Sequence, residues 1–233
     1  NKIWQDMEKF AQYAFNKSHS TCYALVAYHC AYLKAHYPSE FMAGLVSNNM
    51  DNIDEVGKYM QEAKKMGIDV LGPDINESSY RFTVNKKGQI RFGLSALKGV
   101  GENLVKEMEE NRALKGEFAD IYDFVSRLGS TVINKRALEP LAMGGAFDCF
   151  ADLEREQYYE IVSDKEGSFI ERLIKFSNSV NSSQTSGGNL FGDTFVDMVD
   201  KPLPPKLGEF NVLERLEKEK EVLGMYLSGH PLD

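Results

Sequence analysis

The first part of the chain has the spacing of apolar residues that helices require. From Tyr23 to Leu33 nearly every position is apolar, whichever side of a helix it would face. A helix that is apolar all round is usually buried, so we expect a central helix here. Ser18 or Ser20 can cap its start, and it should end before Pro38.

A second helix is predicted after Asp51 or Asn52, either of which can cap it. Its apolar residues fall on one face, and Gly67 follows as a stop signal. That face consists of Ile53, Val56, Met60 and Ala63. Residues 1–72 are therefore expected to be helical.

The period of the pattern changes after Gly72-Pro73. Apolar and polar residues then alternate in two short runs, as they do along strands. The runs are Tyr80, Phe82, Val84 and Ile90, Phe92, Leu94, joined by the turn-forming sequence Asn85-Lys86-Lys87-Gly88. We predict a small β-hairpin connector over residues 73–95.

Short helices are predicted again over residues 96–150. One covers residues 118–128. Another is capped by Asn134 and ends at Gly144-Gly145, and Pro140 inside it should kink it unless its first turn starts late. The segment from Ala142 to Phe147 is a candidate for a degenerate glycine hairpin.

The last third is expected to contain two helices and a linker. A helix is predicted from Glu154 to Phe176, within residues 151–176. Residues 177–206 are rich in Ser, Asn, Gly and Pro, which is typical of a flexible linker. Residues 207–233 contain a charged helix whose acidic and basic residues should face solvent. The predicted fold class is therefore mainly α with one small β-hairpin.

The sequence Gly99-Val100-Gly101 carries the most informative chemistry, because a helix is predicted to start directly after it. Glycines permit positive φ and leave open the amide groups of a helix N-terminus, where phosphates bind. A tight turn without a ligand is the alternative explanation. Glu102 would compete with a phosphate for this helix end. The residues expected to contact a nucleic-acid backbone are Lys98, Gly99, Val100, Gly101, Glu102, Asn103 and Lys106.

Composition and charge restrict this interpretation. The 27 Lys and Arg residues against 35 Asp and Glu give a net charge of −8, which excludes a uniformly basic nucleic-acid binder. Cys22, Cys30 and Cys149 do not have disulfide or metal-site spacing, so buried free thiols in a reducing cytoplasm are expected. No apolar run is long enough to span a bilayer, and no membrane partner or signal peptide is predicted.

Several segments together closely resemble the family of bacterial replicative DNA polymerase III alpha subunits, the C-family polymerases. They follow one another in the same order along the whole chain. They are Phe15-Asn16-Lys17-Ser18-His19-Ser20, Tyr23-Ala24-Leu25-Val26, residues 32–42, Pro73-Asp74-Ile75-Asn76, Phe92-Gly93-Leu94, Lys98-Gly99-Val100-Gly101-Glu102, Gly145-Ala146-Phe147-Asp148, and Leu223 to Pro231.

The resemblance implies a piece of a longer polypeptide. Residues 1–72 would end the fingers domain, residues 96–150 would be a tandem helix-hairpin-helix region, and residues 207–233 would lead to the next domain. Lys17, Ser18 and His19 would face a nucleotide or template, although an ordinary helix cap with a solvated lysine is the alternative. The family's two magnesium ions would lie on palm aspartates upstream. We therefore expect no catalytic residue, metal or cofactor here, and no polymerisation by this piece alone.

The resemblance also implies partners: primer-template DNA, a sliding clamp, and the remainder of the alpha subunit and replicase. The clamp would bind a short peptide in the linker, Gly187, Gly188, Asn189, Leu190 and Phe191. Gly187 stands where that family's motif has a glutamine. A pair of apolar residues fixed to its own domain is the alternative for Leu190 and Phe191.

Two other functions are consistent with parts of the sequence. One is a helix-hairpin-helix module of a repair enzyme or nuclease, which the fingers-like first third disfavours. The other is a protein-interaction scaffold, in which Gly99 and Gly101 only form turns. DNA binding that falls steeply with salt would separate the first from the second.

Overall fold

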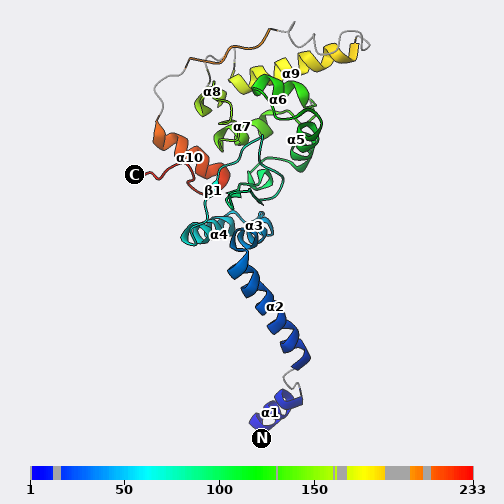
Figure 1. Ribbon diagram of the computed structural model, residues 1–233, viewed down its shortest axis with the longest axis vertical. Coiled ribbons are helices and arrows are strands. Elements are labelled where there is room, and N and C mark those ends of the chain that lie inside the picture. The colour runs from blue at the N-terminus through cyan, green and yellow to red at the C-terminus, as the bar shows by residue number, and fades with distance from the viewer. Residues whose placement is uncertain are drawn as a thin grey trace.

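The computed structural model describes residues 2–12, 17–129, 131–159, 161, 167–186, 200–206 and 211–232. The described part is mainly helical, as the sequence predicts, and contains one three-stranded sheet where a two-stranded hairpin was expected (Figure 1). The elements are α1 (Lys2–Gln12), α2 (Lys17–His36), α3 (Pro38–Ser47), α4 (Ile53–Lys65), β1 (Val70–Leu71), β2 (Thr83–Val84), β3 (Ile90–Arg91), η1 (Leu94–Ala96), α5 (Glu102–Lys115), α6 (Ile121–Arg127), α7 (Lys135–Met143), α8 (Arg155–Tyr159), α9 (Phe169–Ser186) and α10 (Val212–Leu223).

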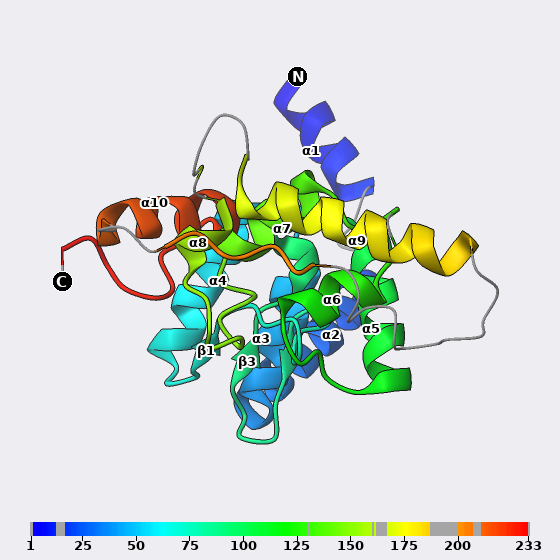
Figure 2. The same cartoon turned by 90° about the horizontal axis from the view of Figure 1, so that it is seen from above.

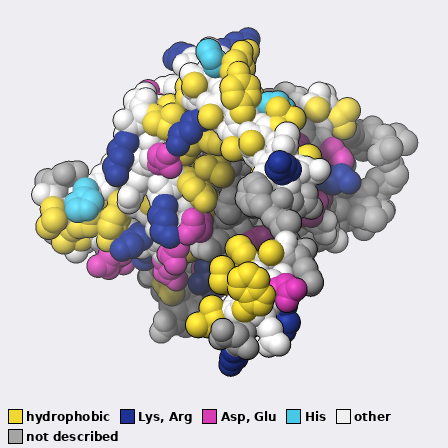
Figure 3. Space-filling view, turned by 90° about the horizontal axis from the view of Figure 1, so that it is seen from below, with side chains coloured by type: hydrophobic (Ala, Val, Ile, Leu, Met, Phe, Trp, Pro, Cys, Tyr) yellow, Lys and Arg dark blue, Asp and Glu magenta, His cyan; other side chains and the backbone are white. Residues whose placement is uncertain are grey.

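Helix α2 differs from the expected buried helix, because none of its residues is buried. It projects from the body of the molecule and touches it at one end, where it meets α3 and where Lys34 pairs with Glu62 of α4 (Figure 1). Burial needs neighbours on every side, and the described residues supply them only at this end. Apolar side chains therefore stand at the surface beside charged ones on the face that bears α1 and α2 (Figure 3).

The start of α2 also differs from the prediction. The helix begins at Lys17, so Ser18 and Ser20 lie in its first turn and neither is its cap. The hydroxyl of Thr21 donates to the Lys17 carbonyl at 2.8 Å, within the helix.

Helix α4 forms as predicted. The Asn52 side chain accepts a hydrogen bond from the Glu55 amide, which caps the helix. Val56, Met60 and Ala63 are buried. The chain then turns at Gly67, whose φ is +77°. The interior face of α4 packs against α3, so these helices join the end of α2 to the sheet.

The sheet contains the predicted hairpin and one further strand. β2 and β3 pair antiparallel, with Val84 opposite Ile90, and the Asn85 side chain accepts amide hydrogen bonds within the turn. β1 pairs parallel to β3, with Val70 opposite Ile90. We did not predict β1, because a two-residue strand is too short to show an alternating pattern.

The remaining helices enclose an aromatic core. α9 lies against α6 and α7, and α8 contacts both α7 and α9 (Figure 2). Rings from these helices and from the segments next to them meet at centroid distances of 5.0–6.0 Å, edge-on or tilted, as aromatic pairs prefer. They belong to Phe118, Phe124, Phe147, Tyr158 and Phe169. This core is the support on which the candidate site is built.

The helix predicted from Glu154 to Phe176 is two helices, α8 and α9. Between them, Ile161 forms an isolated β-bridge with Ser168, and Gly167 has a φ of +70°. Glycine at positive φ favours a reversal of the chain over a continuous helix. The apolar spacing of each half resembled that of one longer helix, which explains the error.

The linker expected over residues 177–206 is also partly wrong. α9 continues through the Ser- and Asn-rich sequence to Ser186, because Val180 is buried and the Ser177 hydroxyl donates to the Val125 carbonyl at 2.7 Å. Residues 200–206 are extended and docked: Tyr122 donates to the Pro202 carbonyl and Gln157 to the Pro205 carbonyl, at 2.7 and 2.6 Å. Tertiary packing therefore overrides composition on both sides of residues 187–199.

Three further expectations concern the whole described chain. Cys22, Cys30 and Cys149 are exposed, so the expectation of buried thiols is wrong. In the described residues, no group of three or more His, Cys, Asp or Glu side chains is placed to hold a metal ion. Nor does that part of the chain contain a helix long and apolar enough to cross a membrane.

Candidate nucleic-acid interface

The turn between η1 and α5 packs its two glycines in different ways. Gly99 has a φ of +101°, and a Cβ atom there would lie 3.2 Å from the Arg136 carbonyl oxygen and 3.3 Å from Pro140 Cγ. A Cβ atom at Gly101 would meet nothing within 4 Å. Gly99 therefore allows the turn to pack closely on α7, whereas Gly101 leaves open space in front of α5.

The N-terminus of α5 has no side-chain cap. Gly101 is its N-cap residue, and its carbonyl accepts from the Val105 amide at 3.5 Å. The amides of Glu102, Asn103 and Leu104 have no hydrogen-bond partner among the described residues. Unpaired amides at the positive end of a helix dipole favour an anion, so this end of α5 has the chemistry of a phosphate site.

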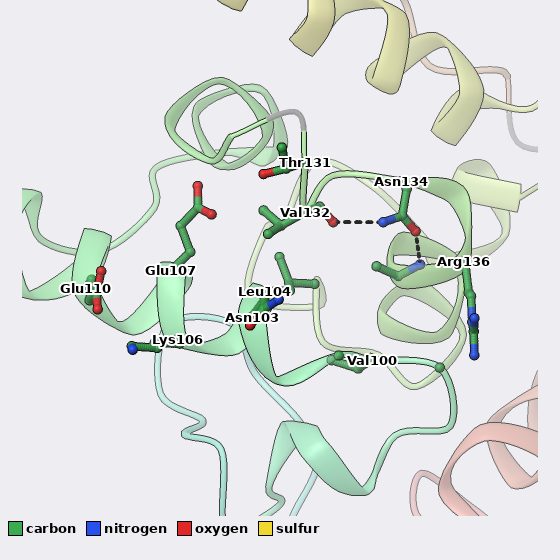
Figure 4. A pocket seen from close by; sticks show the side chains of 13 residues that line it. Val100, Asn103, Leu104, Lys106, Glu107, Glu110, Thr131, Val132, Asn134 and Arg136 are labelled. Carbon is green, nitrogen blue, oxygen red and sulfur yellow. Dashed lines mark hydrogen bonds between the residues drawn. The ribbon is translucent and has the colours of Figure 1, made fainter.

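A second turn, from Gly129 to Asn134, leads into α7. The amides of Val132 and Ile133 both donate to the Gly129 carbonyl, at 3.0 and 3.2 Å. The Asn134 side chain accepts from the Ala137 amide at 3.0 Å and donates to the Val132 carbonyl at 3.2 Å (Figure 4). The sequence predicted the Asn134 cap correctly but did not show that this turn stands beside Gly99.

The two turns border one open groove of about 950 Å³ (Figure 4). Five of the seven residues predicted to contact a nucleic-acid backbone line it: Gly99, Val100, Gly101, Asn103 and Lys106. Lys98 and Glu102 are exposed but do not line it. The other lining residues are Leu104, Glu107, Glu110, Thr131, Val132, Asn134, Arg136 and Ala137.

The groove has few available positive charges. Lys106 and Arg136 line it, and neither forms an ion pair within the described part of the chain. Lys135, next to Arg136, is already engaged: it donates to Glu171 at 2.7 Å, and this hydrogen bond raises the pKa of Lys135. Anion binding here would therefore depend on backbone amides with limited help from lysine and arginine.

The segment from Ala142 to Phe147 is not a second hairpin of this kind. The amides of Gly144, Gly145 and Ala146 donate to carbonyls of α7, so they close the C-terminus of that helix. A Cβ atom at Gly145 would lie 2.2 Å from Arg155 Nη2, so Arg155 covers this glycine. The glycine pair is similar to that of the first turn, but no helix starts directly after it.

The remaining predicted residues lie elsewhere. Lys17, Ser18 and His19 are exposed in the first turn of α2, at the end that is directed away from the body (Figure 1). The structure therefore does not bring them to the groove. Gly187, Gly188, Asn189, Leu190 and Phe191 lie outside the described residues, between the end of α9 and the docked residues 200–206.

Comparison with known proteins identifies this region. Residues 67–158 match a family described as a helix-hairpin-helix motif, and this range contains both turns of the groove. Over its whole length, the chain is similar to DNA polymerase III subunit alpha. The resemblance predicted from the sequence is confirmed.

Three relatives of that name give the extent of the similarity. The protein from Deinococcus radiodurans is 42% identical over 233 residues, which are 100% of this chain and 17% of the relative. Those from Pseudomonas fluorescens and Campylobacter jejuni are 40% and 41% identical, over 99% of this chain and 20% and 19% of the relatives. The chain thus spans about a fifth of the length of the DNA polymerase III alpha subunits that it matches.

Proposed function

We propose that this chain is part of a DNA-directed DNA polymerase of the replicative type, and that the groove between α5 and α7 holds the backbone of primer-template DNA. The nucleotidyl transfer belongs to the whole enzyme, with magnesium on aspartates outside this chain. The fragment alone is inactive in this proposal. Its other partners are the remainder of the alpha subunit and replicase, in the cytoplasm.

The observation that carries this proposal is the pair of helix N-termini at one groove. The amides of Glu102, Asn103 and Leu104 at α5, and those of Lys135 and Arg136 at α7, have no hydrogen-bond partner among the described residues. Amide groups contact phosphate oxygens and no base edge, so binding would be independent of sequence.

The charges that line the groove limit its affinity for DNA. Two basic residues, Lys106 and Arg136, and two acidic residues, Glu107 and Glu110, line the groove, so few phosphates would be neutralised. We expect the logarithm of the binding constant to fall with the logarithm of the salt concentration with a slope of about −2. The rest of the polymerase must then supply most of the affinity for DNA.

The test is fluorescence anisotropy of the 233-residue chain with labelled primed duplex DNA, across a salt series. Gly101→Glu places a carboxylate at the α5 N-terminus, in space that is empty, and should weaken binding about tenfold. Gly44→Glu on α3 adds the same charge where a Cβ also meets nothing within 4 Å, and should have almost no effect. Absence of binding by the unmodified chain at low salt would leave the scaffold alternative.

The sequence between α9 and residues 200–206 is the basis of a second proposal. We propose that Gly187, Gly188, Asn189, Leu190 and Phe191 bind the sliding clamp. Support comes from the sequence and from the docked segments on either side, which keep the peptide attached at both ends. Titration calorimetry with purified clamp tests this: Leu190→Ala should abolish binding, and Gly187→Gln should strengthen it. Equal heats from all three chains would reject the assignment.

The assignment of Lys17, Ser18 and His19 to a nucleotide or template also stays a proposal. The support is their exposure in the first turn of α2 and the similarity to DNA polymerase III alpha. Lys17→Ala in a complete polymerase should raise KM for deoxynucleotides if the side chain meets a triphosphate.

A further inference from the structure

Glu107 joins the two turns of the groove. Its side chain extends from α5 toward the turn that carries Thr131 (Figure 4). One carboxylate oxygen, Oε1, accepts a hydrogen bond from the Gly129 amide, 22 residues further along the chain. Glu107 thus links the helix that follows the first turn to the beginning of the second turn.

The packing around this contact is close. A Cβ atom at Gly129 would lie 3.0 Å from Glu107 Oε1 and 3.6 Å from the Thr131 hydroxyl oxygen. A side chain at position 129 would therefore crowd the carboxylate, which would have to shift by a few tenths of an ångström. The absence of a side chain at Gly129 leaves the space that Glu107 needs in order to reach the amide.

Arg127 supports the same junction from the other side. Its guanidinium donates to the carbonyls of Asn111 and Gly116, both at 2.9 Å, near the C-terminal end of α5. α5 is thus connected to the α6–α7 junction at two points, through Arg127 and through Glu107. The Glu107 contact is the one that belongs to the groove itself.

A carboxylate at this place is unexpected on electrostatic grounds alone. Glu107 lines a groove in which we place phosphates, and like charges repel. Glu110 lines the same groove on the same helix, and its side chain has no hydrogen bond or ion pair within the described residues. Repulsion predicts that loss of either negative charge strengthens DNA binding.

We propose that Glu107 is a positioning residue for DNA binding. Its carboxylate fixes Gly129 against α5 and so sets the spacing between the N-termini of α5 and α7. This inference rests on the proposed function of the groove. It predicts that the contact matters more than the charge, so that loss of the Glu107 side chain weakens binding although the repulsion is removed.

The experiment measures binding of the 233-residue chain to labelled primed duplex DNA for matched pairs of variants. Glu110→Ala and Glu110→Gln should both bind up to about twofold more tightly, because each removes an unpaired charge. Glu107→Gln keeps an acceptor for the Gly129 amide and should behave like them. Glu107→Ala should bind about fivefold more weakly than the unmodified chain. Equal strengthening by Glu107→Ala and Glu110→Ala would overturn the proposal.

Gly129→Ala tests the same contact without a change in charge. Its backbone does not require positive φ, so the new methyl group acts mainly by displacing the Glu107 carboxylate. We expect about fivefold weaker DNA binding. This variant decides the question even if Glu107→Ala does not fold. Unchanged binding by Gly129→Ala would contradict a positioning role.

Hydrogen exchange separates a failure of this inference from a failure of the proposed function. Without DNA, Glu107→Ala should speed amide exchange at Gly129 and over Thr131 to Ala137, while Glu110→Ala should not. If the unmodified chain does not bind DNA, the proposed function fails, and exchange alone judges whether Glu107 fixes the turn. Exchange that is unchanged in Glu107→Ala would refute the inference in either case.

Discussion

The two turns of the groove place helix N-termini side by side by different chemical means. The first turn ends in Gly101, which caps α5 without a side chain and leaves amides open. The second ends in Asn134, whose side chain satisfies the Ala137 amide and fixes the Val132 carbonyl. The first turn is therefore open to a ligand at its tip, and the second is already partly occupied by its own residue.

The supports behind the two turns differ as well. The Lys98 amide donates to the Val222 carbonyl at 3.4 Å, so the first turn contacts α10. The second turn is held by Glu107 from α5. The first turn thus depends on a helix that follows it by more than 100 residues in sequence, whereas the second turn depends on the nearby helix α5. The first turn thus leaves amide donors open, whereas the second is fixed by contacts within the chain.

The largest expected effect concerns the support of the first turn. Glu219 of α10 is buried and accepts from Arg155, from the Ser228 hydroxyl and from the Leu227 and Ser228 amides. Glu219→Ala leaves Arg155 without one of its partners and should cost about 3 kcal/mol of unfolding free energy. Urea unfolding followed by circular dichroism measures it. A loss below about 1 kcal/mol would show that α10 is not a firm support.

The same carboxylate gives an expected pH dependence. Burial opposes ionisation, but hydrogen bonds from Ser228 and Arg155 outweigh it and lower the pKa of Glu219 from its ordinary value of 4.5. A lowered folded pKa contributes stability that is present above 4.5 and is lost as the pH falls through the folded pKa. Between pH 5 and 3 the unmodified chain should lose more stability than Glu219→Gln, measured by urea unfolding. Parallel pH curves would contradict this.

The next effect distinguishes the two glycines of the first turn. Gly99→Ala meets the Arg136 carbonyl and Pro140 at a φ of +101° and should lose about 2 kcal/mol. Gly101→Ala enters open space at a φ of −87° and should lose less than about 1 kcal/mol. Thermal unfolding of both variants tests this order. Equal losses would remove the structural distinction between the glycines.

A smaller effect is expected at the cap of the second turn. Asn134→Ala removes the acceptor of the Ala137 amide and the donor to Val132, and should cost about 1 kcal/mol. Urea unfolding again gives the value. Asn134→Ser keeps a capping oxygen and serves as the control, with most of the stability retained.

The smallest change in stability is expected for a variant that gives the first turn a side-chain cap like that of the second. Gly101→Asn adds a capping side chain in empty space and should stabilise the chain by a few tenths of a kcal/mol. DNA binding should nevertheless weaken, because the cap occupies an amide that we assign to a phosphate. Anisotropy and thermal unfolding of one sample measure both. Stronger binding by this variant would argue against amide recognition at α5.

The sequence predicted local features better than their assembly. The caps at Asn52 and Asn134, the β2–β3 hairpin and the turn at Gly99 each depend on residues within a few positions, and the structure contains them. The similarity to DNA polymerase III alpha was also visible in the sequence, because its motifs are long and in order.

What the sequence did not show depends on contacts between distant segments. The partnership of the two turns requires Gly99 to touch Arg136 and Pro140, which no local pattern encodes. In the sequence, Glu219 resembles the other charged residues of a solvent-facing helix. In the structure, it pairs with Arg155, 64 residues away. The composition around Ser177 predicts a flexible linker, but the Ser177 hydroxyl is buried and donates to the Val125 carbonyl of α6.

The projecting helix α2 has the geometry of a lever arm. Its N-terminal residue, Lys17, lies about 26 Å from the contact between Lys34 and Glu62, since each helical residue adds about 1.5 Å. A tilt of about 10° at that contact would displace Lys17 by about 5 Å, more than the length of a hydrogen bond. The location of Lys17, Ser18 and His19 is therefore controlled by the angle at which α2 leaves α3 and α4.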